Sequence, residues 1–180
     1  MRKLQILFVL ALLTACSAGA TVLTFEDLSG QGMLPSNYGG LTWSDGWEYY
    51  DWSQFPYTPS SGSVRVYNNG GSAPPRFSFA APVVFNGAYF AGYDTAAFEM
   101  YLSGSLMATS STASLGATGV PVWLASGYGG PVDEVRLVVT QGFFVMDDVT
   151  FNGGSAVPEP ATYAMIGLGL AGVAVARRRK

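Results

Sequence analysis

Short apolar runs recur along residues 21–153, and turn-forming residues separate them. Most runs are rich in β-branched or aromatic residues, and none shows the 3.6-residue apolar spacing of an amphipathic helix, so the pattern indicates strands. We expect strands at 21–25, 40–43, 64–67, 76–79, 83–85, 87–90, 97–102, 121–124, 134–140, 143–146 and 147–151. Many short strands with turns between them predict an all-β fold, an antiparallel β-sandwich over residues 21–153.

Residues 103–119 differ from the rest of this region because their apolar side chains are mostly small. We expect a weak edge hairpin there. Gly153-Gly154-Ser155-Ala156 comes after the last strand and predicts a flexible linker, so residues 154–160 connect the sandwich to the C-terminal segment.

The N-terminus has the pattern of an export signal. Arg2 and Lys3 precede an uncharged apolar run that is too short to span a bilayer comfortably, and we expect residues 1–20 to be a signal peptide. Two processing sites are open. Small residues at Ala18-Gly19-Ala20 suit a general signal peptidase, whereas Leu13-Thr14-Ala15-Cys16 resembles a lipobox that would place a lipid on Cys16.

The C-terminus combines three features in a fixed order. Val157-Pro158-Glu159-Pro160 comes first, then an apolar run at 161–176, and then Arg177, Arg178, Arg179 and Lys180. The apolar run would be about 24 Å long as a helix, slightly less than the thickness of one hydrocarbon core. We therefore expect a single transmembrane helix at 161–176 with a cytoplasmic basic tail at 177–180.

This tail resembles the PEP-CTERM sorting signal of Gram-negative bacteria that make extracellular polysaccharide. The resemblance rests on Val157, Pro158, Glu159, Pro160, the small-residue helix and the arginines. It implies that an exosortase, a processing enzyme of the membrane, recognises the tail and cuts near the Pro-Glu-Pro motif. It also implies a membrane-anchored precursor with a periplasmic domain, and then a protein of the cell surface or extracellular matrix. The alternative is a plain C-terminal membrane anchor.

Charge and composition exclude several function classes. Residues 21–156 hold eleven acidic residues against Arg65, Arg76 and Arg136, a net charge of −8. Three scattered bases cannot form the cationic surface that nucleic acid requires, so nucleic acid is excluded as a partner. The chain has no histidine and only one cysteine, which excludes an internal disulfide, zinc fingers and histidine-based triads.

Segments at both ends of the sandwich region resemble a jelly-roll domain that is common among PEP-CTERM proteins and similar in layout to galactose-binding-like domains. These segments are 24–28, 38–43 and 144–151. The resemblance implies that the first and last strands lie together, which would bring Glu26 and Asp27 close to Asp147 and Asp148. Clustered carboxylates need a cation, and hard oxygen ligands suit Ca²⁺, so these four residues are candidates for a structural calcium site. The alternative is that they are two solvated strand ends.

A dense run of aromatic residues lies between Trp43 and Tyr57. We expect a long loop after Trp43, with Trp47, Tyr49, Tyr50 and Trp52 as candidate glycan-binding residues, because aromatic faces stack on sugar C–H surfaces. The alternative is that these rings cover the open end of the sandwich.

These observations favour a non-catalytic exported protein of the cell envelope or matrix, associated with exopolysaccharide. The first alternative is a carbohydrate-binding module that uses the aromatic loop. A secreted hydrolase is a weaker alternative, because no motif singles out a pair of catalytic carboxylates.

Overall fold

The computed structural model describes residues 19–71 and 74–153. Twelve strands and one short 3-10 helix, η1 (Tyr38–Gly40), make up this part of the chain, and all strand pairs are antiparallel. The strands are β1 (Ala20–Leu23), β2 (Gln31–Met33), β3 (Leu41–Trp43), β4 (Trp47–Tyr50), β5 (Arg65–Asn68), β6 (Arg76–Gly92), β7 (Thr95–Leu102), β8 (Ser105–Thr109), β9 (Ala113–Ser114), β10 (Val122–Ala125), β11 (Val132–Val139) and β12 (Phe144–Gly153).

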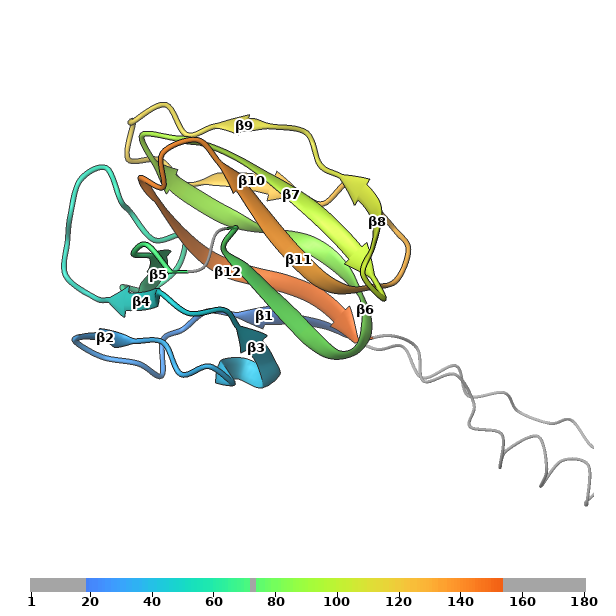
Figure 1. Cartoon of the computed structure of the whole chain (residues 1–180). Helices are drawn as coiled ribbons and strands as arrows, with labels where there is room; N and C mark the ends of the chain where they lie inside the picture. Colours follow the sequence, from blue (N-terminus) through green and yellow to red (C-terminus); the bar gives the residue numbers. More distant parts are fainter. Residues whose placement is uncertain (1–18, 72–73, 154–180) are drawn as a thin grey trace, which may run out of the picture.

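The long strand β6 joins two layers of sheet (Figure 1). Its first part pairs with β3 and β11, and its second part pairs with β12 and β10. One layer continues from β11 to β7 and then to β8 and β9, while the other continues from β12 to β5, β4 and β2. The predicted antiparallel β-sandwich is confirmed.

The core lies between the two layers and follows the alternation of the sequence. Phe77, Phe85 and Phe90 of β6 are buried. The rings of Phe85 and Phe90 both contact Phe98 of β7, Phe90 also contacts Phe144 of β12, and Phe77 packs against Phe85. The residues that alternate with the buried ones point to the outer faces, where the β7–β11 layer carries Glu99 and Arg136 and the β4–β5–β12 layer carries Tyr50 and Tyr67.

Several predicted strands have different bounds in the structure. The runs expected at 76–79, 83–85 and 87–90 form the single strand β6, because Ala80 to Pro82 continue the extended chain past a register shift with β11 instead of turning. Proline lacks the N–H of a ladder bond, so its place at this irregularity is reasonable. Residues 103–119 lie at the edge of the layer, as predicted, but they do not form a hairpin of their own, because β8 and β9 each pair with β7 and not with one another.

The long loop predicted after Trp43 does not begin there, so this part of the prediction is wrong. Residues 47–50 form β4, which pairs with both β2 and β5. Ser44, Asp45 and Gly46 connect β3 to β4, and the long connection begins only after Tyr50.

The predicted cleavage region, Cys16, the linker, the Pro-Glu-Pro motif and the helix at 161–176 lie outside the described residues, except for Gly19, Ala20 and Gly153. Within residues 19–71 and 74–153, no helix has the length and apolar character needed to span a membrane.

Candidate functional site

The first and last strands lie together, as the jelly-roll resemblance implied. β1 pairs with the second half of β12, from Ala20 opposite Asn152 to Leu23 opposite Val149. Asp147 and Asp148 lie within β12 at a register shift, and not at the start of a strand as expected. Asp148 has a positive φ of 49°, which is consistent with a bulge at this position.

The acidic residues at the two strands hold one segment of the chain. Residues 51–64, which we call the covering segment, connect β4 to β5. The Glu26 carboxylate accepts the N–H groups of Ser63 and Val64, at 3.0 and 2.7 Å. Asp147 accepts the N–H groups of Ser60 and Ser61, at 2.8 and 2.9 Å. The far end of the covering segment is therefore fixed by one carboxylate from β12 and one from the turn after β1.

The four predicted calcium ligands act as hydrogen-bond acceptors. Asp148 accepts the Ser61 hydroxyl at 2.8 Å, and Asp27 accepts the Tyr38 hydroxyl. In the part of the chain that the structure describes, no three acidic side chains are placed to hold a metal ion. This arrangement does not fit the predicted calcium site, because the carboxylates meet N–H and O–H donors where the site requires them to face a common cation.

Asp147 is the most buried of these carboxylates, with 2% of its surface exposed. Burial raises the pKa of Asp147 to about 7, and the nearby Asp148 carboxylate adds to the rise. The N–H groups of Ser60, Ser61 and Asp148 act in the opposite direction, because they stabilise the ionised form. Asp147 is thus a carboxyl group that titrates near neutral pH beneath the covering segment.

The predicted glycan-binding residues separate into two groups. Trp47 is buried in the core, with edge-to-face contacts to Trp43 and Phe144, so its assignment to an exposed loop is wrong. Tyr49 points to the same side of β4 and packs against the core. Tyr50 and Trp52 lie on the opposite side and contact each other, with ring centroids 4.7 Å apart.

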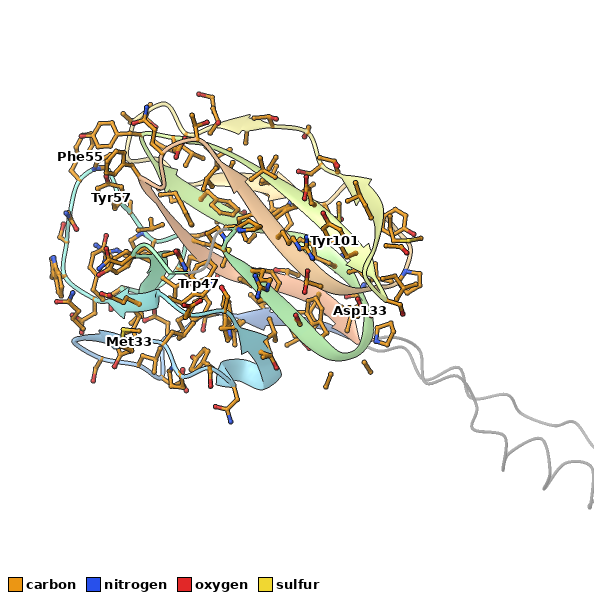
Figure 2. All side chains as sticks on the ribbon, in the orientation of Figure 1. Met33, Trp47, Phe55, Tyr57, Tyr101 and Asp133 are labelled. Atoms are coloured by element: carbon orange, nitrogen blue, oxygen red, sulfur yellow. The ribbon has the colours of Figure 1, made fainter. Side chains whose placement is uncertain are left out.

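Tyr50 and Trp52 line a cleft of about 530 Å³ on the outer face of the β4–β5–β12 layer. We call it the aromatic cleft. Its rings also include Tyr57 of the covering segment, Tyr67 of β5 and Phe143 of the turn before β12. Trp52 and Phe143 are 45% and 54% exposed, so two rings present faces or edges to solvent. Figure 2 shows Tyr57 and Phe55 at the same end of the molecule, in the covering segment.

The rings of the aromatic cleft are held by their neighbours. The Arg65 guanidinium lies 4.0 Å from the centre of the Tyr50 ring and donates to the carbonyl groups of Trp52 and Ser63. Arg65 is 1% exposed, so it acts beneath the cleft and not in it. This contact fixes the ring of Tyr50 and the start of the covering segment together.

Four amide side chains complete the lining: Gln54, Asn68, Asn69 and Gln141. Each can donate and accept hydrogen bonds, which matches the hydroxyl groups of a sugar. Glu48 lies behind two lining residues and accepts the Tyr67 hydroxyl at 2.5 Å and the Asn69 amide at 3.0 Å. The hydrogen bond from Tyr67 is the main reason that the pKa of Glu48 lies below its usual value.

Asp94 fixes the wall of the cleft that residues 141–143 form. Its carboxylate accepts four backbone N–H groups, from Thr95, Thr140, Gln141 and Gly142, at 2.7 to 3.1 Å. Burial alone would raise the pKa of Asp94, but these four donors outweigh it and hold the pKa below the usual value. Asp94 thus ties the β6–β7 turn to the β11–β12 turn that carries Gln141 and Phe143.

Sequence reasoning missed most of the cleft. Tyr67, Asn68, Asn69, Gln141 and Phe143 are not among the predicted site residues, although they line it. In sequence, the Asn68-Asn69-Gly70-Gly71 run indicates only a turn. The sequence does carry a signal for these residues, because amide and aromatic side chains are neighbours both at residues 67–69 and at residues 141–143.

Comparisons with known proteins agree with the sorting tail. Residues 156–180 match the family model described as PEP-CTERM protein-sorting motif. No curated protein matches the sequence. Among solved structures, a DUF4465 family protein from Bacteroides caccae is similar, with 13% identity and a TM-score of 0.48. The alignment covers 75% of this chain and 99% of that protein. The chain therefore carries a PEP-CTERM sorting motif, the mark of an exported, exosortase-sorted protein, behind an all-β sandwich domain.

Proposed function

We propose that the sandwich binds extracellular polysaccharide in the aromatic cleft, and that the sorting tail delivers this binding domain to the cell surface. The observation that carries the proposal is the lining of the cleft, in which rings alternate with amide groups. Rings such as Trp52 can stack on the C–H face of a pyranose, while Gln54 and Gln141 can bond its hydroxyl groups. The resemblance of the tail to signals of polysaccharide-producing bacteria supports the same ligand class.

The size and open shape of the site suit a stretch of polymer better than a small enclosed ligand. A cleft of about 530 Å³ is within the usual range of ligand sites, and it opens on the outer face of a sheet. Exposed rings continue beyond it. Tyr93 is 60% exposed and meets Tyr57 edge to face, with centroids 5.8 Å apart, and Phe55 is 72% exposed. A chain of sugars leaving the cleft would meet these rings next.

The protein acts in this proposal by binding and not by catalysis. A glycosidase requires two carboxyl groups on either side of the scissile bond. Of the described residues that line the aromatic cleft, none is acidic. The Glu48 carboxylate, which lies behind the lining, is occupied by Tyr67 and Asn69. Incubation of a bound polysaccharide with the protein is therefore expected to release no new reducing ends.

Replacement of one exposed ring tests the proposal. Trp52→Ala in the full-length chain is expected to weaken polysaccharide binding at least about tenfold, since tryptophans in ligand-binding surfaces often contribute about 2 kcal/mol or more. Retardation in gels that contain a series of polysaccharides measures the effect.

Tyr101→Ala is the matched control for this experiment. Tyr101 is also aromatic, but it lies in the other layer, stacked under Arg136, and Figure 2 shows it far from Tyr57. Its variant should bind like the wild type. Equal binding by wild type and Trp52→Ala would place the ligand elsewhere, and the absence of binding by the wild type to every polysaccharide would refute the proposed function.

A further inference from the structure

The aromatic cleft offers many hydrogen-bonding groups but no charge. Its polar side chains are amides and tyrosine hydroxyls, and among the described residues that line it none is basic or acidic. We propose that the cleft selects uncharged glycans and discriminates against glycans that carry carboxylate, sulfate or phosphate groups. This inference rests on the proposed function and narrows its ligand class.

None of the three described arginines lines the aromatic cleft. Arg65 is buried under Tyr50, and its side chain donates to backbone carbonyl groups. Arg76 and Arg136 are cross-strand partners in the β6–β11 ladder. Arg136 lies over the Tyr101 ring and bonds Glu134 at 2.5 Å, on the outer face of the other layer. An acidic sugar in the cleft would therefore lose part of its hydration shell without forming an ion pair with one of these arginines.

The surroundings of the cleft carry negative charge. Glu48 contacts the Tyr67 hydroxyl and the Asn69 amide from behind, and its lowered pKa keeps it ionised at neutral pH. Residues 21–156 as a whole have a net charge of −8. Both the local and the overall field oppose an anionic polymer, whereas a neutral polymer is unaffected by them.

A matched pair of polymers tests the selection directly. Hydroxyethyl cellulose and carboxymethyl cellulose share one glucan backbone and differ in charge, and neutral mannan with acidic alginate extends the comparison to a second pair of related sugars. The full-length chain is expected to bind neutral members at least about tenfold more tightly than acidic ones. Binding of neutral members should change little between low and high salt, because screening affects only charged pairs.

The outcomes separate the two proposals. Binding of acidic polymers that equals or exceeds that of neutral ones, and that weakens with salt, would overturn the inference and leave glycan binding intact. Failure of every polymer in both sets to bind would overturn the proposed function itself, and the inference with it.

A charge placed in the cleft gives a second test on the protein side. Gln141→Lys introduces a cation at an exposed lining position. It is expected to increase the affinity for carboxymethyl cellulose several-fold, in a manner that high salt removes. Leu106→Lys adds the same charge at an exposed position of β8 in the other layer, and should not produce this gain. An equal gain in both variants would show a nonspecific effect of net charge and contradict the inference.

Discussion

The stability of the wild-type sandwich is expected to fall by roughly 4 kcal/mol between pH 4 and pH 8, relative to the Asp147→Asn variant. Burial raises the pKa of Asp147 to about 7, from a usual value near 3.8. The folded protein therefore holds this proton more tightly than the unfolded chain does. The resulting stabilisation is complete below about pH 4, and it is lost as the pH rises through about 7.

Urea unfolding at several pH values measures this difference in the free energy of unfolding. Asparagine stays neutral at every pH, so its own effect on stability is the same throughout. Glu48 and Asp94, whose pKa values are lowered, titrate in both proteins and cancel in the comparison. If the wild type instead gained stability relative to Asp147→Asn as the pH rose, the N–H groups of Ser60 and Ser61 would outweigh burial, and the raised pKa would be wrong.

The Asp94→Ala variant is expected to lose about 2–4 kcal/mol of stability and to bind glycan at least about tenfold more weakly. The substitution leaves the N–H groups of Thr140, Gln141 and Gly142 without their acceptor. The turn that carries Gln141 and Phe143 would then lose its connection to the β6–β7 turn, and one wall of the aromatic cleft would lose its fixed position. Urea unfolding and gel retardation measure the two effects.

Asp133→Ala provides the matched control. The Asp133 carboxylate also accepts a backbone N–H, that of Ser103, at 2.8 Å, but it holds a turn far from the cleft (Figure 2). Its variant should lose about 1 kcal/mol or less and retain normal glycan binding. Normal binding by a folded Asp94→Ala protein would show that the position of the 140–143 turn does not matter to the ligand.

The fold was predictable because the alternation of apolar and polar residues is strong where both layers face the core. Phe77, Phe79 and Phe85 mark the inner face of β6 without any knowledge of its partners, whereas Phe90 is out of phase with them because the register with β12 shifts near Gly87. The exact extent of β6 was not predictable, since Ala80 to Pro82 look like a break in sequence. Whether the chain turns there depends on β11 and β12, which lie far along the sequence.

The prediction of a loop for the aromatic residues after Trp43 failed for a different physical reason. Trp47 and Tyr50 are both large rings at the two ends of β4, and composition does not reveal that this strand sends them to opposite sides of one layer. Alternation along a strand sends them to opposite sides, but only the long-range pairing with β2 and β5 shows that this segment is a strand. An aromatic run in sequence therefore supplied both a core residue and a cleft residue.

The cleft itself was only partly predictable because three separate segments form it. The covering segment comes after β4, the Asn68–Gly71 turn comes after β5, and Gln141 and Phe143 precede β12. They meet because β5 pairs with β12, with Val66 opposite Met146. The same topology explains the carboxylates. Glu26 and Asp147 both accept N–H groups of the covering segment, a shared partner that the sequence did not predict.

Hydrogen exchange of the full-length chain, with and without a saturating neutral glycan, tests the central claim most directly, because it locates the ligand. We expect slower exchange of backbone amides in residues 50–57, 67–71 and 141–145, and little change in β7 and β8 of the other layer. Protection confined to another surface, such as the exposed Trp123 and its neighbour Tyr89, with none in those three segments, would contradict the claim that glycan occupies the aromatic cleft.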